Sequence, residues 1–380
     1  MPRDVFSRLA RARCDEKFVL RNRFLGVAEI GIGRCACESG GKIFHARSFD
    51  SLETFSLNPR WEISLRENIV FTTRRLDAAE ALDPEKFQSE LNTLIASSVE
   101  SDSGEIPEIP PPQEVGGNWY PDAARELIEE IHAGKLKKIV LSRSIRSVAE
   151  TPISAEAIFG KLEERFGKTC TIFSVSHDGK TFLGATPELL VRLRDGILET
   201  EALAGSVSNF PGADTSVLAR QLLENDKERR EHRAVVDFIA EKLREIGLCV
   251  NFPEIPEVVV LPNILHLRTP IRAIVNPKTH VLDIVSALHP TPAMCGVPAG
   301  KAREKILSVE PFPRGYFAGP LGFYESDGSG FFAVGIRSAE IRDNEIRLFA
   351  GSGLVAGSTP NREFAEIDSK FSAILSLIRQ

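Results

Sequence analysis

A glycine-rich turn near the C-terminal end runs into a segment that carries an acid and a base four residues apart. Residues 351–370 read GSGLVAGSTPNREFAEIDSK, and Glu366 and Lys370 share one edge of the helix predicted there. Glycine lets a backbone approach an anion closely, and a helix N-terminus adds free N–H groups. The stretch suggests a metal-bound carboxylate beside an anion-binding loop, although on spacing alone a surface salt bridge is the better explanation.

Four other charged side chains interrupt apolar patterns elsewhere in the chain. Glu231 lies on the apolar face of a predicted helix, where an unpaired carboxylate is costly and a bound Mg²⁺ would offset that cost. Lys138 begins the predicted strand KIVLSR and could act as a base. Glu188 follows a Thr-Pro pair and precedes two leucines, so it could stay protonated and act as an acid. Arg337 lies in FFAVGIRSAEI and suits bidentate binding of a carboxylate.

Each of these groups also has a plain structural explanation. Glu231 could be a helix-start glutamate at the edge of the core, and Lys138 a strand-end lysine that reaches solvent. Glu188 could be an ordinary turn residue, and Arg337 half of a buried ion pair. Gly205, with the serine that follows it in ALAGS, offers backbone and hydroxyl donors.

Apolar periodicity and turn signals predict the elements that must position these groups. We expect an exposed connection over 101–117, and hairpins that turn at two Asp-Gly pairs and one Asp-Asn pair. Because hairpins outnumber βαβ units, the pattern favours an α+β fold with antiparallel sheets. The predicted helices cover 84–99, 121–132, 153–166 and 226–246, and the predicted strands cover 138–143, 171–177, 181–185, 189–193, 197–202, 331–341 and 345–350.

Composition limits the classes of function. The 380 residues are 42% hydrophobic and 26% charged, which is typical of a globular protein with a large core. A formal net charge of −6 argues against a general nucleic-acid binder. No apolar run reaches the ~18 residues of a membrane helix, and the N-terminus lacks the apolar region of a signal peptide. With six scattered cysteines, we expect a cytoplasmic protein with reduced thiols, and a monomer, because a domain this large can bury its own core.

Taken together, the segments resemble the chorismate-utilising enzymes related to anthranilate synthase component I. The resemblance covers about 110–371, and two of its segments, LHPTPAMCG and the closing one, are highly specific. It implies one large α+β domain over 1–380, with two facing antiparallel sheets flanked by helices, a divergent part at 1–110 and a catalytic core at 111–380. The matching segments are KKIVLSR, FLGATPELL, ALAGS, DKERREH, ILHLRT, LHPTPAMCG, FAGPLGF, GIRSAEI and GSGLVAGSTPNREFAEIDSKF.

Within that family, three positions resemble the members that form isochorismate for catechol siderophores. Lys138 stands where anthranilate-type members carry a glutamine. Leu203 fits the isochorismate group, because aminodeoxychorismate synthases have a lysine before the glycine of ALAGS. Phe317 stands where salicylate-forming members commonly have a tyrosine.

The resemblance implies an Mg²⁺-dependent isomerase in which water adds to C2 of chorismate and the C4 hydroxyl leaves. Lys138 would be the base and Glu188 the acid, on opposite sides of the ring. Glu231 and Glu366 would hold the metal. The residues implied in substrate binding are Gly205, Ser206, His266, Thr269, Arg337, Gly353 and Lys370.

The resemblance leaves several alternatives open. A salicylate synthase would also eliminate pyruvate, a menaquinone-pathway enzyme would make the same isochorismate, and a more distant possibility is a non-catalytic chorismate-binding homologue. An anthranilate synthase subunit is less favoured, because it would use ammonia. For the siderophore branch, an isochorismatase is the expected downstream partner.

Overall fold

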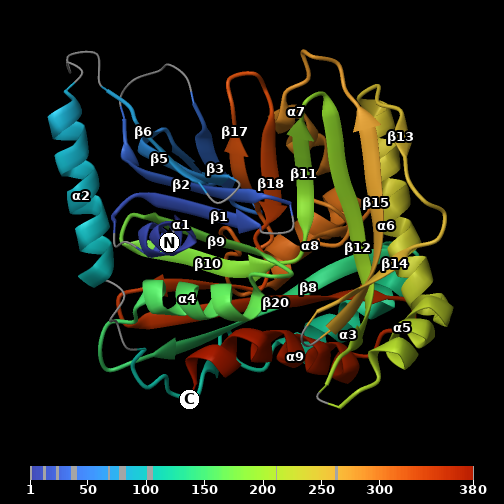
Figure 1. Cartoon of the computed structure of the whole chain (residues 1–380). Coiled ribbons are helices and arrows are strands. Elements are labelled where there is room, and N and C mark those ends of the chain that lie inside the picture. The colour runs from blue at the N-terminus through green and yellow to red at the C-terminus, as the bar shows by residue number, and fades with distance from the viewer. Residues whose placement is uncertain are drawn as a thin grey trace.

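The computed structural model describes residues 2–11, 14–22, 25–35, 41–66, 69–76, 83–100, 106–210, 212–261 and 264–379. Over these residues the chain forms two large antiparallel sheets with helices packed around them (Figure 1). The predicted α+β class with two facing antiparallel sheets is therefore confirmed. The first five residues of the predicted connection at 101–117 lie outside the described residues.

The larger sheet has eleven strands within the described part of the chain. Its long strands β8 and β20 pair along their whole length, with Lys138 opposite Val355 and Val148 opposite Glu345. The two-residue strand β7 (Gln113–Glu114) pairs with β8 off the main path. The order is β16 (Gly296–Val297), β8 (Lys138–Val148), β20 (Glu345–Val355), β19 (Ser338–Arg342), β10 (Lys180–Thr186), β9 (Thr171–His177), β1 (Lys17–Asn22), β2 (Val27–Arg34), β5 (Pro59–Arg66) and β6 (Ile69–Arg74).

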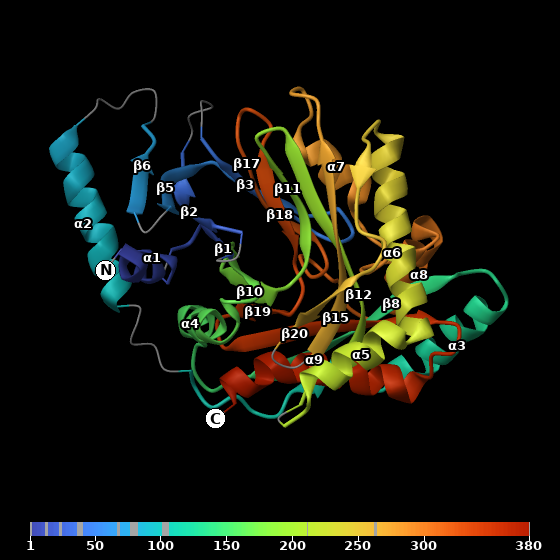
Figure 2. The same cartoon turned by 45° about the vertical axis from the view of Figure 1, so that its right-hand side comes forward.

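The smaller sheet has nine strands among the described residues and stands at a steep angle to the larger one (Figure 2). Strand β14 (Glu257–Val260) pairs with β15 off the main path. The order is β13 (Val250–Asn251), β15 (Ile264–Ile274), β12 (Ile197–Ser208), β11 (Leu189–Arg194), β18 (Gly330–Val334), β17 (Pro320–Tyr324), β3 (Ile43–Arg47) and β4 (Thr54–Leu57).

Strands of the N-terminal part belong to both sheets. In the larger sheet β1 pairs with β9, and in the smaller sheet β3 pairs with β17. The blue strands of Figure 1 therefore continue sheets whose other strands come from the middle and the end of the chain.

Helices pack against both sheets. Helices α3 and α9 contact β20, α4 contacts β9 and β10, and α6 lies along β12 and β15. The predicted helix at 226–246 is one residue too long, because α6 ends at Glu245 and Ile246 is exposed. The helices are α1 (Pro2–Ala10), α2 (Pro84–Glu100), α3 (Tyr120–His132), α4 (Ala155–Phe166), α5 (Thr215–Glu224), α6 (Asp226–Glu245), α7 (Val281–Leu288), α8 (Ala299–Val309) and α9 (Pro360–Ile378).

The two predicted Asp-Gly turns are confirmed. Asp178 and Gly179 join β9 to β10 with φ of 50° and 68°, and Asp195 and Gly196 join β11 to β12 with φ of 52° and 73°. A two-residue hairpin turn that matches the strand twist needs positive φ at both positions, which aspartate and glycine tolerate. These local turns fix which residues of the two hairpins face each other.

The prediction of one continuous strand over 331–341 is wrong. The chain leaves the smaller sheet after β18, passes through Gly335 to Arg337, and enters the larger sheet as β19. Arg337 adopts a φ of 51°, which is uncommon for a residue with a Cβ atom. The sequence is apolar on both sides of this break because each strand is buried in its own sheet, so the pattern looked continuous.

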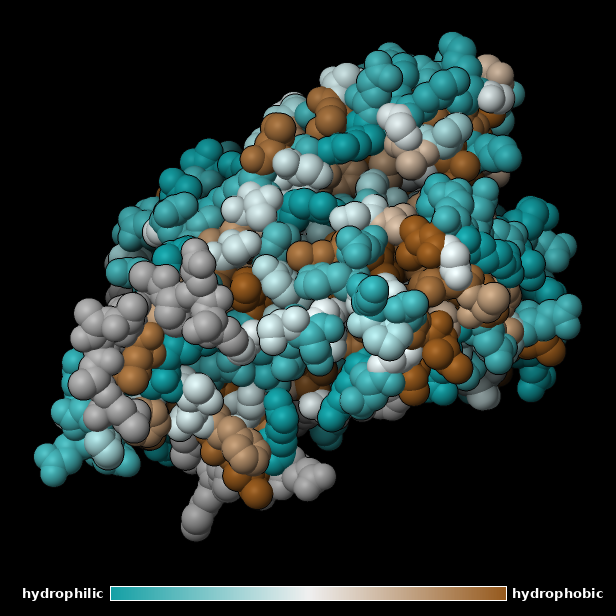
Figure 3. Space-filling view, turned by 90° about the horizontal axis from the view of Figure 1, so that it is seen from above, coloured by the Kyte–Doolittle hydropathy of each residue, from teal (hydrophilic) through white to brown (hydrophobic). Residues whose placement is uncertain are grey.

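The face seen from above is largely polar, with apolar residues in scattered patches (Figure 3). Across the residues that the structure describes, we find no helix with both the length and the apolar character needed to cross a membrane.

Candidate active site

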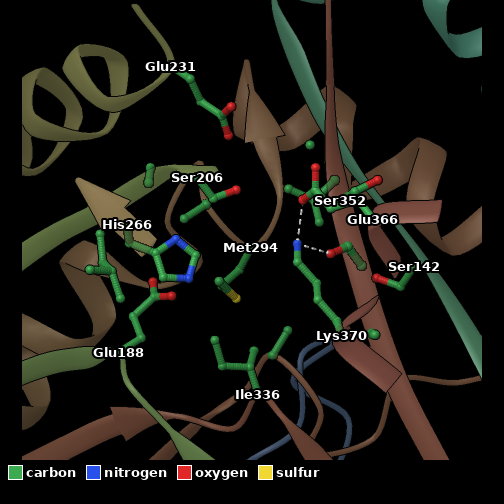
Figure 4. Close-up of a pocket in the computed structure, with 18 of the residues that line it drawn as sticks. Ser142, Glu188, Ser206, Glu231, His266, Met294, Ile336, Ser352, Glu366 and Lys370 are labelled. Atoms are coloured by element: carbon green, nitrogen blue, oxygen red, sulfur yellow. Dashed lines mark hydrogen bonds and ion pairs between the residues drawn. The ribbon is translucent and has the colours of Figure 1, made fainter. Parts of the chain in front are cut away.

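A cavity lies between the two sheets and the first turns of α6 and α9. Strands β8 and β20 supply one wall, while β12 and β15 supply another. In Figure 4, Glu188, Ser206 and His266 lie on one side of the cavity, and Glu366 and Lys370 on the other. Thr269 is not in its lining, but every other predicted site residue is: Lys138, Glu188, Gly205, Ser206, Glu231, His266, Arg337, Gly353, Glu366 and Lys370.

Lys138 begins β8, and its side chain is buried. Period-2 alternation places it on the same face as Val140 and Ser142, and all three line the cavity. The Nζ atom donates a hydrogen bond of 2.8 Å to Oε1 of Glu231 from α6. The predicted base and the predicted metal ligand thus form an ion pair that bridges the larger sheet and α6.

Lys370 and Glu366 form the i,i+4 pair that their spacing suggested. Lys370 Nζ donates to Glu366 Oε1 at 2.7 Å and to the carbonyl oxygen of Gly351 at 2.8 Å. Burial would raise the pKa of Glu366, but the Lys370 ammonium outweighs it, and the pKa is lowered. The pair is therefore a salt bridge that lies inside the cavity, not on the outer surface.

Sequence reasoning missed two further acids, Glu228 and Glu363, which lie three residues before Glu231 and Glu366. Both missed acids are buried and line the cavity. Burial and the neighbouring acids raise the pKa of Glu228 and of Glu363. A signal was present, because Glu-x-x-Glu occurs in both segments and puts two acids on one helix face. We call these four residues the carboxylate cluster.

Glu188 lies in the short connection between β10 and β11, and only 6% of its surface is exposed. Burial is the main cause that raises its pKa to about 8, and the nearby carboxylate of Glu201 raises it further. Lys138, Arg337 and Lys370 act in the opposite direction. At pH 7 the Glu188 carboxyl is therefore mostly protonated, as an acid catalyst requires.

His266 of β15 lies beside Ser206 of β12 in the strand register. Burial lowers the pKa of His266 to about 3, and the charges of Arg337 and Lys370 add to this effect. Its Nδ1 atom is buried and has no hydrogen-bond partner among the described residues. The ring is therefore neutral at physiological pH and retains a free polar atom at the cavity wall.

Arg337 lies where the chain passes from one sheet to the other, so its side chain reaches the cavity between them. Burial lowers the pKa of its guanidinium. No acid in the described part of the chain forms an ion pair with this side chain. A partly buried arginine without a counter-ion is suited to binding the carboxylate of a ligand.

Two glycines make room for the groups around them. Gly205 adopts a φ of 76°, and a Cβ atom there would lie 2.8 Å from the carbonyl oxygen of Glu228. A Cβ atom on Gly353 would lie 2.9 Å from Cε of Lys138. The backbone N–H of Ser206, a residue predicted to bind substrate, donates to Oε2 of Glu228 at 2.9 Å.

The structure places Thr269 behind the cavity wall. Its hydroxyl bonds to Nε2 of His232 at 2.7 Å, and Nδ1 of the same ring bonds to the carbonyl oxygen of Ala204 at 3.1 Å. Thr269 therefore supports the strand that carries Gly205, and this position does not fit the predicted direct contact with a substrate.

The carboxylate cluster has the chemistry of a magnesium site, because Mg²⁺ prefers carboxylate oxygens. Oε1 of Glu363 is buried without a hydrogen-bond partner in the described residues, as expected of an atom that can coordinate a metal ion. In this structure Glu231 and Glu366 each form an ion pair with a lysine. Among the described residues, no three His, Cys, Asp or Glu side chains converge on one point. The donor set fits the metal, with Glu231 and Glu366 as the predicted ligands and Glu228 and Glu363 beside them.

Comparisons with known proteins agree with this geometry. Residues 45–379 match the family model described as chorismate binding enzyme. Isochorismate synthase DhbC of Bacillus subtilis is 36% identical over 279 residues, which span 71% of this chain and 69% of DhbC. Isochorismate synthase EntC of Escherichia coli K12 is 35% identical over 64% of this chain and 62% of its own length.

The fold comparison gives the same family. The solved structure of MenF, the menaquinone-specific isochorismate synthase of Escherichia coli, superposes with a TM-score of 0.86 at 27% identity, covering 98% of this chain and 91% of MenF. Isochorismate synthases are isomerases (hydroxymutases), so the relatives' names agree with the predicted enzyme class. By sequence and by fold, the chain belongs to the family of chorismate-binding enzymes.

Proposed function

We propose that this chain is an isochorismate synthase that converts chorismate to isochorismate by adding water at C2 and releasing the C4 hydroxyl. The observation that carries the proposal is the pair formed by Lys138 and Glu188. Lys138 reaches the cavity from β8 of the larger sheet, and Glu188 reaches it from the connection between the two sheets, where the pKa of its buried carboxyl is raised to about 8. A protonated acid facing an amine across a cavity is what an exchange of hydroxyl between two ring carbons needs.

Each proton transfer can be assigned to one side chain. The ammonium of Lys138, which is paired with Glu231 in this structure, must first release a proton, and its amine then takes a proton from the attacking water while the oxygen bonds to C2. Glu188 gives its proton to the C4 hydroxyl, which leaves as water while the ring double bonds shift. The atoms balance, because one water enters and one leaves.

The cavity can also hold the two carboxylates of chorismate. The partly buried Arg337 has no acidic partner in the described residues, and Lys370 adds a second cation. His266 contributes a neutral ring whose Nδ1 atom has no hydrogen-bond partner among the described residues. Because these groups come from three separate parts of the chain, they would fix the orientation of the ring between the base and the acid.

Magnesium, held by Glu231 and Glu366, would supply a Lewis acid for one carboxylate of the substrate. Glu228 and Glu363 lie next to these acids in the same cavity and complete the carboxylate cluster. The ammonium of Lys370 lowers the pKa of Glu366 and so favours the charged form that a metal ligand needs.

We further propose that the product enters 2,3-dihydroxybenzoate and catechol siderophore synthesis, with an isochorismatase as the next enzyme. The similarity to DhbC and EntC supports this branch, while the similarity to MenF supports the menaquinone branch. Phe317, which stacks on Phe349 with ring centroids 5.4 Å apart in the cavity wall, agrees with an enzyme that does not go on to salicylate. The monomeric state and the cytoplasmic location stay predictions.

Incubating the purified full-length chain with chorismate and MgCl₂, and separating the products by liquid chromatography, tests the activity. Isochorismate alone is the expected product. Salicylate together with pyruvate would assign the chain to the salicylate synthases, and anthranilate formed only with added ammonium would assign it to the anthranilate synthases. Repeating the assay after EDTA treatment tests the metal requirement.

A further inference from the structure

Three lysines pair with the four acids of the carboxylate cluster, two through short hydrogen bonds and one through longer ionic contacts. Lys138 and Lys370 each donate a short hydrogen bond to one acid, at 2.8 and 2.7 Å. Lys370 is also fixed by the carbonyl oxygen of Gly351. The third lysine, Lys227, was not singled out by the sequence and has no part in the proposed chemistry.

Lys227 lies between the two remaining acids of the cluster. Its Nζ atom is 3.7 Å from Oε1 of Glu228 and 3.9 Å from Oε1 of Glu363. Both distances exceed that of a hydrogen bond, so the contact rests on charge alone. The Glu363 oxygen has no hydrogen-bond partner within the described residues. Lys227 thus links the first turns of α6 and α9 through an ionic contact, and another cation could take its place.

The position of Lys227 also allows its ammonium group to move out of the cavity. It lines both the active-site cavity and a groove outside it that Lys137, Arg230 and Glu241 border. Its side chain is 24% exposed, compared with 5% for Lys138 and 16% for Lys370. A flexible side chain at this junction can turn its ammonium outward into water without moving the helix.

We propose that Lys227 is a resident counter-cation, which neutralises Glu228 and Glu363 while no metal is bound and competes with divalent cations for the carboxylate cluster. The proposal rests on the metal site of the proposed function. A unit positive charge next to the acids offsets part of their repulsion in the metal-free protein and opposes the approach of a second cation. The lysine would therefore keep the metal-free fold stable and the metal exchangeable.

Metal titration of the EDTA-treated full-length chain tests this role without chorismate. Mn²⁺ is the probe, because its free form is counted by electron paramagnetic resonance. We expect Lys227→Met to bind Mn²⁺ about ten- to a hundredfold more tightly than the wild type, since a charge that repels the metal has been removed. The metal-free variant should unfold at a lower temperature than the wild type and gain more from added Mg²⁺.

Arg230→Met is the matched control, because it removes an exposed cation from the same helix. Its Mn²⁺ affinity should stay within about twofold of the wild type. Lys227→Gln replaces Lys227→Met if the latter aggregates. Three results would each overturn the proposal. The Mn²⁺ affinity of the neutral Lys227 variants could be unchanged or weaker, or Arg230→Met could gain as much Mn²⁺ affinity as Lys227→Met. The third result is no measurable metal binding by any of the proteins. Product formation by the wild-type enzyme is measured separately, so a failure of the proposed activity stays distinguishable.

Discussion

Replacing Glu188 by glutamine should change how the stability of this protein depends on pH. The side chain is 6% exposed, and burial raises the pKa of its carboxyl from 4.5 to about 8. The folded protein therefore binds this proton more tightly than the unfolded chain does. The resulting stabilisation is complete below pH 4.5 and is lost as the pH rises through about 8. Glutamine has nearly the same shape but no titration.

The size of the effect follows from the two pKa values. At 1.36 kcal/mol for each pKa unit, the folded wild type loses about 3 kcal/mol relative to the glutamine variant between pH 5.5 and 8.5. Glu29 is also buried, and its pKa is raised to about 7, so it makes its own contribution to the pH dependence of stability. That contribution is common to both proteins and cancels in the difference.

Urea unfolding at pH 5.5 and 8.5, followed by circular dichroism, measures this difference. The free energy of unfolding of Glu188→Gln minus that of the wild type should rise by about 3 kcal/mol across this range. Glu241→Gln is the control, because it changes an exposed acid on α6. Its free energy of unfolding relative to the wild type should be the same at both pH values. A pH-independent difference for Glu188→Gln would mean that the carboxyl is ionised in the folded protein. The acid role of Glu188 would then be refuted, because an ionised carboxylate has no proton to give.

Three further changes test the site. Lys138→Ala should lower kcat for isochorismate formation at least about a hundredfold. Lys137→Ala, which changes an exposed neighbour, should leave kcat unchanged. Comparable losses of kcat in both variants would contradict the assignment of Lys138 as the base. Glu201→Gln removes a charge that raises the pKa of Glu188, so the alkaline limb of the kcat–pH profile should move to lower pH, and an unmoved limb would exclude this coupling. Gly205→Ala should lower the free energy of unfolding by about 1–3 kcal/mol in urea titrations, because its φ is 76° and a carbonyl oxygen lies 2.8 Å from the new Cβ; a stable variant would show that the turn can adjust.

Local signals predicted much of the fold. The Asp-Gly turns, the starts of the long helices and the antiparallel class depend on neighbouring residues, and all were predictable from them. Strand length was not, since β8 continues to Val148 beyond the predicted end at 143 because β20 pairs with it throughout. The break at 335–337 was missed because residues on both sides are buried, although in different sheets. Partners distant in sequence decide both features.

The candidate site shows the same division. Lys138, Glu188, Glu231 and Glu366 were selected from the sequence, by residue type and by family resemblance, and all four line the cavity. Thr269 was selected in the same way and lies behind the wall. A motif identifies a residue and its strand, but one strand presents its residues to two faces, and packing decides which face the cavity uses.

By itself, the sequence determined the local geometry: which residues share a helix face, where the Asp-Gly hairpins turn and which segments carry acids and bases. Only the tertiary structure decided the electrostatics. The raised pKa of Glu188 comes from burial, and Lys227 meets Glu363 across more than a hundred residues of chain. The physical reason is that Coulomb and desolvation energies depend on distance and on exclusion of water, and both are set when the two sheets and the helices α6 and α9 pack together.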